Sequence, residues 1–308
     1  MKFGQVGGII AAASKKDAVP LLQLGSISIA KRIVLTLQQA GVFPIVVVTG
    51  TDEIEVVHQL APLGVVFVRN EQCDAPELFS SVKLGLSFLQ GKCDRVVFTP
   101  VNTPMFTPET LRSLLRCDAP VVRPSVGGRG GHPILLSDGV IDGIVCYRRA
   151  DGLRGALRLL ADRTEWVEVA DEGILMSIHN EAQLKAHLKQ HNNAMLSPTV
   201  RASIEKEGAF MGPRLKLLLF LIEDLHSVRK ACMHMGLSYG NAWSTVNRLE
   251  REVGYAVVER KHGGSRGGHT VLTERGVALI RAYQRFETRL QDYAREIFET
   301  ELHQPGLL

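Results

Sequence analysis

The residues with the clearest chemical potential follow the apolar run Val96–Phe98, which Pro100 and Pro104 bound on its C-terminal side. Such a run is typical of a buried central strand in a parallel sheet. Open α/β sheets bind ligands just beyond the carboxyl ends of their strands, so Asn102 is predicted to lie at a ligand cleft. A protein that handles a nucleoside triphosphate would use a carboxylate there to hold Mg²⁺, and this chain offers an amide.

A second group of candidate residues lies in the loop Gly127–Pro133, which is rich in glycine and carries Arg129 and His132. Two strand-like runs flank this loop. Glycine lets a backbone approach a ligand closely, and arginine and histidine supply charge or hydrogen bonds. The same composition also suits a turn, so the loop is predicted either to surround a ligand or only to reverse the chain.

A third polar group lies on a helix predicted over Tyr239–Val253, which Ser238 caps. One face of this helix is apolar, and the opposite face carries Asn241, Ser244, Thr245 and Arg248. A shorter helix precedes it over Val228–Met235 and ends at Gly236. Two helices joined by a glycine turn, the second with a polar face, indicate a helix-turn-helix, and a small three-helix bundle is the alternative.

A basic, glycine-rich segment with Lys261, His262 and Arg266 follows this helix and separates two strand-like runs, Ala256–Arg260 and Thr270–Thr273. A hairpin with such a tip suits a wing, because glycine lets the backbone approach a duplex and the cations can meet phosphate or the minor groove. Residues 213–275 hold ten Lys/Arg and six Asp/Glu, so this region accounts for the whole net charge of +4.

Alternating strand and helix patterns must position the first two groups. Strands are predicted at Val6–Ala12, Ile45–Val48, Val65–Val68, Val96–Thr99 and Val121–Val122, then at Trp166–Val169 and Ile174–Ile178. Helices are predicted after Ser28 and at Ile54–Leu60, Leu78–Leu89, Pro108–Leu115, Gly152–Leu160 and Glu181–Leu188. This order predicts an α/β fold with a doubly wound, mostly parallel sheet whose ligands gather at the strand ends, including Asn70–Glu77.

A length of 308 residues favours two domains. We predict domains at residues 1–190 and 213–308, joined by a linker at 191–212 where the apolar pattern is lost. The five cysteines are scattered without zinc-site spacing, which indicates reduced thiols. No apolar run is long enough to span a bilayer, and the N-terminus reads as a strand, so we expect a cytoplasmic protein without a membrane partner.

Residues 6–188 resemble the molybdenum-cofactor nucleotidyltransferase family, closest to its cytidylyltransferase branch. The stretches that carry the resemblance include GGIIAAAS (7–14), RVVFTPVNTP (95–104), GGRGGHPILL (127–136) and DGLRGAL (151–157). The resemblance implies transfer of a nucleotidyl group from CTP or GTP to the phosphate of molybdopterin, with Mg²⁺ and release of pyrophosphate.

The chain departs from this family at the positions that carry its chemistry. The glycine of the family's first phosphate-binding loop falls at Ala13, beside Ala12, and the following residues Ser14, Lys15 and Lys16 belong to a shortened loop. The family's two metal aspartates fall at Asn102 and His179. An amide brings no charge and imidazole is a poor ligand for a hard cation, so a weakened Mg²⁺ site is expected, with Asn102 as its remaining ligand.

The parts that surround the nucleotide and substrate in the family are better retained. The resemblance assigns nucleotide or substrate contacts to Ser80, Ser81 and Lys83 on one helix, to His132 in the glycine-rich loop, and to Arg154. Ordinary helix-start polarity is the alternative for the two serines. The pocket is therefore expected to persist as a shape while its catalytic charges are reduced.

The C-terminal region resembles the winged helix of molybdate-responsive (ModE-type) and LysR-type regulators, through residues 227–250 and 258–276. The resemblance implies binding of double-stranded DNA. It assigns DNA contacts to Tyr239, Asn241, Ser244, Thr245 and Arg248, with Lys261, His262 and Arg266 in the wing, and it favours a core role for Trp243. The helical pattern at 275–299 matches the pairing helix of those regulators and predicts a homodimer, and packing on its own domain is the alternative.

Two functions follow from these resemblances. The first is a nucleotidyltransferase of molybdenum-cofactor maturation with a fused DNA-binding regulator domain. The second is a transcription regulator whose degraded transferase domain senses a nucleotide or a pterin. The sequence leaves both open.

Overall fold

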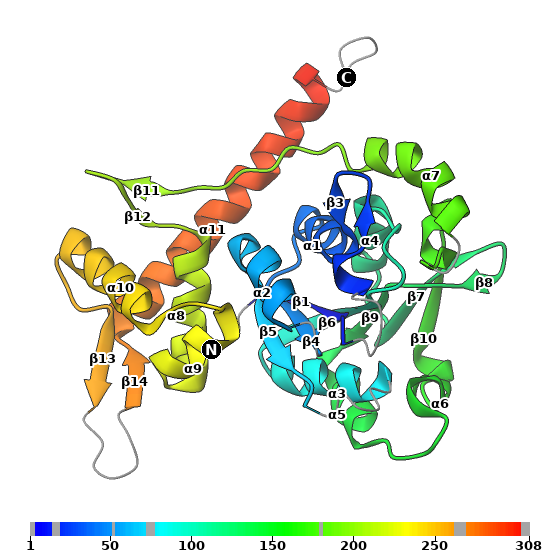
Figure 1. Ribbon diagram of the computed structural model, residues 1–308, viewed down its shortest axis with the longest axis horizontal. Coiled ribbons are helices and arrows are strands. Elements are labelled where there is room, and N and C mark those ends of the chain that lie inside the picture. The colour runs from blue at the N-terminus through cyan, green and yellow to red at the C-terminus, as the bar shows by residue number, and fades with distance from the viewer. Residues whose placement is uncertain are drawn as a thin grey trace. The chain divides into compact units, whose positions relative to one another are not determined.

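The computed structural model describes residues 4–13, 19–50, 53–71, 78–178, 181–261 and 269–302. The chain divides into two compact units, Lys2–Leu196 and Ser197–Leu308 (Figure 1). We call them the first unit and the second unit.

The first unit is built on one twisted sheet with the strand order β10-β7-β9-β6-β1-β4-β5, and β8 pairs with β7. Its strands are β1 (Gly4–Ala11), β4 (Ile45–Thr49), β5 (Val66–Arg69), β6 (Cys93–Pro100), β7 (Val121–Val126), β8 (Arg129–Gly130), β9 (Ile134–Ser137) and β10 (Thr164–Glu168). All of the path strands are parallel except β9, which runs antiparallel between β6 and β7. The predicted fold class is confirmed, and the antiparallel strand is the feature that the pattern did not indicate.

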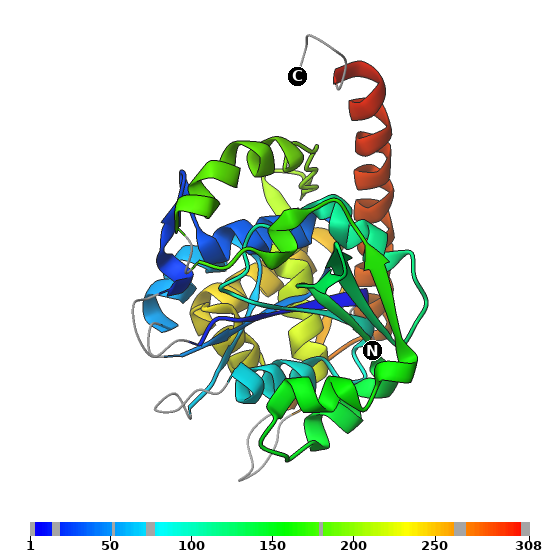
Figure 2. The same ribbon diagram turned by 90° about the vertical axis from the view of Figure 1, so that its right-hand side faces the viewer.

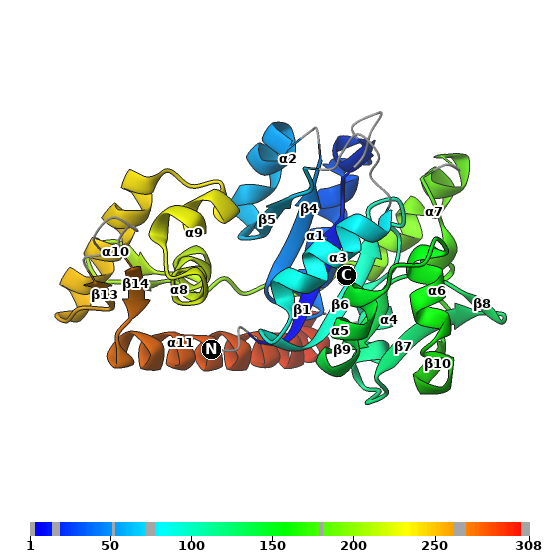
Figure 3. The ribbon, with the colours of Figure 1, turned by 90° about the horizontal axis from the view of Figure 1, so that it is seen from below.

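Helices cover both faces of this sheet. Figures 1 and 3 show α1, α4 and α7 on one face, with α3, α5 and α6 on the other. The helices are α1 (Ile29–Gln39), α2 (Glu53–Leu60), α3 (Leu78–Leu89), α4 (Pro108–Leu115), α5 (Asp138–Cys146), α6 (Gly152–Arg158) and α7 (Glu181–Ala194). Short 3₁₀ turns and a small ribbon complete the unit: η1 (Val19–Leu21), β2 (Gln23–Leu24), β3 (Ile27–Ser28), η2 (Ala61–Leu63), η3 (Ala161–Arg163) and η4 (Glu172–Leu175).

Side-chain caps fix where two of these helices begin. The Ser28 hydroxyl accepts a hydrogen bond from the backbone N–H of Lys31, and Thr107 does the same for Thr110. Both caps satisfy amides that have no partner inside their helix. The predicted start of α1 after Ser28 is confirmed.

Two predicted segments differ in the structure, and a third region forms a helix that the pattern did not indicate. Residues 174–178, predicted as a strand, begin in the 3₁₀ turn η4 and then run without regular structure, because Asp171 caps the turn through the backbone N–H of Gly173. Helix α7 continues to Ala194, and its residue His191 is fully buried. The predicted linker therefore begins inside α7. The sequence of this helix is mostly polar, so its apolar pattern does not indicate the face that packs on the unit. Helix α5 was not predicted.

Residues 197–212 of the predicted linker belong to the second unit. A hairpin of β11 (Ile204–Glu205) and β12 (Ala209–Met211) leads into α8 (Pro213–Leu225), α9 (Val228–Met235) and α10 (Tyr239–Val253). The strands β13 (Val258–Lys261) and β14 (His269–Leu272) pair antiparallel, and α11 (Glu274–Ile297) continues as a π-helical turn, Phe298–Leu302. Figure 2 shows α11 as a long straight helix. Side-chain caps at Ser227, Ser238 and Thr273 begin α9, α10 and α11.

Two carboxylates fix the β13–β14 ribbon on the helices. Glu250 of α10 accepts hydrogen bonds from the backbone N–H groups of Val257 and Val258, at 2.7 and 2.9 Å. Glu223 of α8 accepts one from Leu272, at 2.8 Å. The ribbon is therefore held at both strands. In the described part of the chain, no helix is long and apolar enough to cross a membrane.

Candidate functional site

The carboxyl ends of the central strands meet beside Asn102. Ala11 of β1 pairs with Pro100 of β6, and the N–H of Val101 donates to the carbonyl of Ala11 at 3.0 Å. Ala12 is buried and donates to the carbonyl of Val48 at 2.9 Å. Asn102 follows as a half-buried residue. Strands β1, β4 and β6 therefore end together, as expected of a ligand-binding edge.

A second segment reaches the same edge. The N–H of Ile178 donates to the carbonyl of Asn102 at 3.0 Å. Ile178 directly precedes His179, which lies outside the described residues. The backbone thus brings the end of the 171–178 segment to Asn102 from 76 residues away. Among the described residues, no group of three or more His, Cys, Asp or Glu side chains has an arrangement that would hold a metal ion.

The predicted phosphate loop is only partly described. Ala13 is half-buried, and Ser14, Lys15 and Lys16 lie outside the described residues. Their contact with a triphosphate stays a prediction.

Ser80 and Ser81 lie at the start of α3 and bind the end of β5. The side-chain amide of Asn70 donates to the hydroxyls of Ser80 and Ser81, at 3.0 and 3.1 Å. Asn70 and Ser81 are each only 1% exposed. Sequence reasoning named the strand end at 70–77 and did not single out Asn70. Its burial and its two serine partners come from the packing of α3 on β5, which no local pattern reports.

The described contacts of Lys83 include the end of α5, and Arg154 lies on α6. The ammonium of Lys83 donates to the carbonyl of Tyr147 at the end of α5, and it lies 4.2 Å from the ring centre of Phe79. Arg154 is exposed on α6. Their assignment to nucleotide or substrate rests on the resemblance and stays a prediction.

His132 is held by the loop that carries it. Its backbone N–H donates to the carbonyl of Ile174 at 3.1 Å, and its ring meets Phe98 edge-on at 5.6 Å. Burial and the nearby charge of Arg123 lower the pKa of His132 to about 4. The imidazole is therefore neutral at neutral pH. These contacts hold the glycine-rich loop against the sheet and η4.

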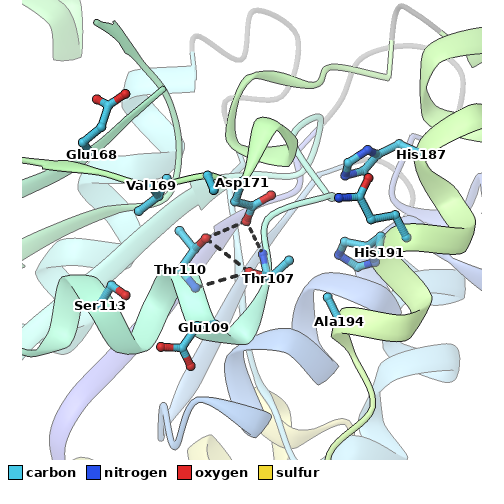
Figure 4. Close-up of a pocket in the computed structure, with 12 residues that line it drawn as sticks. Thr107, Glu109, Thr110, Ser113, Glu168, Val169, Asp171, His187, His191 and Ala194 are labelled. Carbon is cyan, nitrogen blue, oxygen red and sulfur yellow. Dashed lines mark hydrogen bonds between the residues drawn. The ribbon is translucent and has the colours of Figure 1, made fainter. Parts of the chain in front are cut away.

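A hollow of about 330 Å³ opens elsewhere in the first unit, between α4, β10 and α7. Figure 4 shows Asp171 on its wall beside Thr107 and Thr110. The Asp171 carboxylate accepts from the N–H of Thr107 at 2.8 Å, the hydroxyl of Thr110 at 2.6 Å and the N–H of Gly173 at 2.9 Å. Its oxygens serve to join α4 to η4, and none of the predicted site residues that the structure describes lines this hollow.

In the second unit, the predicted DNA-contact residues of α10 lie mostly on its open side. Tyr239, Asn241, Ser244 and Thr245 are exposed, whereas Ala242, Val246 and Leu249 are buried. This alternation follows the 3.6-residue period of an amphipathic helix. The side chain of Lys261 is not described, and His262 and Arg266 lie outside the described residues.

Trp243 links α10 to the ribbon. The guanidinium of Arg260 on β13 lies 3.7 Å from its ring centre, and Tyr239 meets it edge-on at 6.2 Å. Trp243 is half-buried. A cation over an indole face contributes about 0.5–2 kcal/mol, so this contact orients the ribbon relative to α10.

Arg248 meets the β11–β12 hairpin. A Cβ atom on Gly208 would lie 2.5 Å from Arg248 Nη2, so the guanidinium lies close against the hairpin turn. Gly208 also has φ 147°, which favours glycine. The hairpin turn therefore lies against the C-terminal half of α10.

The segment between the hairpin and α7 is attached to α11. Gln291 donates to the carbonyl of Pro198 at 2.8 Å and accepts from the N–H of Val200 at 2.9 Å. The hydroxyl of Tyr283 donates to the carbonyl of Ala202 at 2.6 Å. Phe286 and Tyr293 of α11 are 45% and 60% exposed.

Ser238→Ala is expected to destabilise the second unit by about 1 kcal/mol, because it leaves the N–H of Asn241 without its cap. Ser244→Ala on the exposed face of the same helix is the control and is expected to change the free energy of unfolding by less than about 0.5 kcal/mol. Urea unfolding followed by circular dichroism measures both. Equal losses for the two variants would contradict the capping role.

Comparison with known proteins identifies the first unit. Residues 18–167 match the family model of the MobA-like NTP transferase domain. The chain carries a MobA-like NTP transferase domain. A nucleotidyl transferase from Methanothermobacter thermautotroptrophicus shares the fold at 19% identity, over 60% of this chain and 98% of its own, with a TM-score of 0.53. A Mycobacterium sp. strain JC1 homolog of Mycobacterium tuberculosis rv0371c does so at 20% identity, over 60% and 97%, with a TM-score of 0.51.

The C-terminal region is similar to MopB and ModE proteins. It is 38% identical over 84 residues to the molybdenum-pterin-binding protein MopB of Rhodobacter capsulatus, which is 27% of this chain and 31% of that protein. It is 36% identical over 74 residues to the DNA-binding transcriptional dual regulator ModE of Escherichia coli K12, which is 24% of this chain and 28% of that protein. The chain therefore joins an NTP transferase domain to a ModE-like region, and it spans about a third of the length of these relatives.

Proposed function

We propose that this protein is a DNA-binding transcription regulator whose MobA-like domain binds a nucleotide or a pterin of molybdenum-cofactor metabolism. The observation that carries the proposal is the hydrogen bond from Ile178 to Asn102. It joins the two segments to which the resemblance assigns the family's metal positions, and neither position is a carboxylate in this chain. Since Mg²⁺ is bound in such sites through carboxylates, nucleotidyl transfer would lack the charge that balances the cation, while the strand ends can still bind a ligand.

The ModE-like region supports the regulator part. Four polar residues on the exposed side of α10 and a ribbon held by Glu250 and Glu223 match a recognition helix with its wing. The name of the Escherichia coli relative states that it binds DNA, and here DNA binding is a proposal. We further propose a homodimer through residues 275–299, with the exposed rings of Phe286 and Tyr293 as part of the contact.

An active transferase is the second candidate. The family match over residues 18–167 and the hydrogen-bonded serines of α3 favour it, because the resemblance assigns nucleotide contacts to these serines. In this case the chain would transfer a cytidylyl or guanylyl group to molybdopterin, with Mg²⁺, and regulate transcription as a fused domain.

One pair of measurements separates the candidates. Calorimetry with CTP and with GTP tests binding, and pyrophosphate release with Mg²⁺ and molybdopterin tests transfer. Binding without release supports the regulator. Release at a rate usual for nucleotidyltransferases, about 1 s⁻¹ or faster, would overturn it in favour of the enzyme.

Restoring both carboxylates should restore metal binding. Asn102→Asp combined with His179→Asp is expected to tighten Mg²⁺ binding about tenfold or more, because it adds two negative charges at one cation site. Calorimetric titration with MgCl₂ measures the change. Asn193→Asp, on the exposed end of α7, adds a carboxylate elsewhere and should leave Mg²⁺ affinity unchanged. An unchanged affinity in the double variant would mean that the site is altered beyond these two residues.

A further inference from the structure

Arg123 is a half-buried cation for which the described residues supply no counter-charge. It lies on β7 directly opposite Trp166 of β10, and its guanidinium carbon is 4.4 Å from the centre of a ring of that indole. Its Nε is buried and has no hydrogen-bond partner among the described residues, and none of their carboxylates forms an ion pair with it. An arginine stays charged, so burying it unpaired costs folding free energy. The contact with the indole face offsets part of this cost, and no carboxylate of the described residues offsets the rest.

His132 presents a second unpaired nitrogen on the same side of the sheet. Val97 of β6 and Val122 of β7 both pair with Leu135 of β9, so these three side chains share one face of the sheet. Side chains alternate along a strand, so Phe98 and Arg123, which follow Val97 and Val122, share the opposite face. The His132 ring meets Phe98 edge-on. Its Nδ1 is buried and has no hydrogen-bond partner in the described part of the chain. Buried polar atoms in folded proteins are nearly always paired. The charge of Arg123 acts on His132, so the two side chains are near enough to interact, and their unpaired atoms indicate a missing partner.

The backbone fixes the orientation of His132. A Cβ atom on Gly130 would lie 2.3 Å from Cζ3 of Trp166, and one on Gly131 would lie 2.4 Å from the carbonyl oxygen of Ile174. The N–H of Gly131 donates to the carbonyl of Pro124 at 3.0 Å. The loop thus lies against the indole and against η4 at distances that only glycine allows. The site is formed before any ligand arrives.

We propose that Arg123 and His132 form a subsite for a small oxyanion of the phosphate class, with Trp166 as its wall. The guanidinium offers forked N–H donors that match two oxygens of a phosphate, and the imidazole adds one further hydrogen bond. This inference rests on the proposed ligand-binding role of the transferase domain. It adds Arg123, which neither the sequence motifs nor the comparisons assign to a ligand.

Calorimetry at constant ionic strength, with inorganic phosphate and inorganic pyrophosphate as probes and without metal, tests the subsite. Arg123→Met keeps the apolar stem under Trp166 and removes the charge. It is expected to weaken binding of the better probe about tenfold or more. Arg163→Met is the matched control, because Arg163 is an exposed arginine three residues before Trp166. It should bind the probe as the unaltered protein does. Equal affinity in the Arg123→Met variant, or no probe binding by the unaltered protein, would overturn the proposal.

The melting temperature without ligand supplies a second readout. If Arg123 is kept for an anion, Arg123→Met should melt at the same temperature or higher, because it removes an uncompensated charge. Added phosphate should then raise the melting temperature of the unaltered protein and leave that of the variant unchanged. A variant that melts lower and still responds to phosphate would show that Arg123 only packs against Trp166.

The oxyanion could belong to an acceptor or to the nucleotide. Saturating phosphate that leaves CTP affinity unchanged would assign the subsite to an acceptor, and phosphate that displaces CTP would assign it to the nucleotide. Both outcomes support the subsite. If CTP and GTP bind but Arg123→Met changes no probe binding, only this inference fails. If no nucleotide or probe binds, the proposed function fails as well.

Discussion

Lowering the pH from 7 to 5 is expected to reduce the free energy of unfolding of the first unit by about 4 kcal/mol, because two of its histidines are buried in the neutral form. His191 is fully buried, with Nδ1 3.1 Å from Arg32 Nη1 and Nε2 3.2 Å from the carbonyl oxygen of Phe106. Burial is the main cause that lowers the pKa of His191 to about 4, and burial also lowers the pKa of His132 to about 4.

The sign follows from proton binding. Well above pH 6.5 both histidines are neutral in the folded and unfolded chains, and their protonation does not reduce the free energy of unfolding. Between about pH 6.5 and pH 4 the unfolded chain binds protons that the folded chain excludes, so stability falls as the pH falls. Each histidine then contributes a loss of about 2 kcal/mol at pH 5, and the loss stops growing below about pH 4.

Tryptophan fluorescence during urea unfolding measures this difference. The chain has two tryptophans, and Trp243→Phe leaves Trp166 as the reporter of the first unit. His191→Gln is expected to lower stability at both pH values, since it removes the contacts with Arg32 and Phe106, but to shrink the pH difference by about half. His58→Gln, on an exposed position of α2, should leave the difference unchanged. A pH difference that persists after both buried histidines are replaced would contradict this assignment.

Affinity for duplex DNA is expected to fall about a thousandfold as salt rises from 50 to 200 mM. Each protomer of the proposed dimer carries three phosphate-binding cations in its recognition helix and wing, so the dimer would release about six counterions. The cations are Arg248, Lys261 and Arg266. Fluorescence anisotropy with labelled duplexes measures the slope of log affinity against log salt. An affinity that does not depend on salt would contradict DNA binding by this surface.

Single substitutions refine this test. Arg266→Ala should weaken binding to all duplexes and reduce the salt slope by about one for each phosphate that the variant no longer neutralises. Arg248→Ala should also change sequence preference, because residue 248 belongs to the predicted recognition helix. Arg163→Ala removes an equal charge from the first unit and should leave the slope unchanged. If Arg163→Ala lowers the salt slope as much as Arg266→Ala does, the change in slope reflects net charge only.

The sequence by itself determined most of the elements and their order. The apolar run at Val96–Phe98 became the centre of β6, and the capping serines at 28, 227 and 238 begin the helices that they predicted. These signals are local, because the periodic spacing of apolar residues in a strand or helix and the capping residue both lie within a few neighbouring positions. The alternating order was likewise enough to predict a doubly wound sheet.

Only the tertiary structure decided which residues meet. Hydrogen bonds join Asn70 to Ser81, Ile178 to Asn102, and Arg32 to His191, which lies 159 residues away in the chain. The polar sequence of α7 concealed its buried end, and the 204–211 segment became a hairpin against Arg248. The unpaired atoms of Arg123 and His132 also become apparent only when β7, β10 and the glycine loop pack together. Such contacts join distant segments, and no short window of sequence carries their geometry.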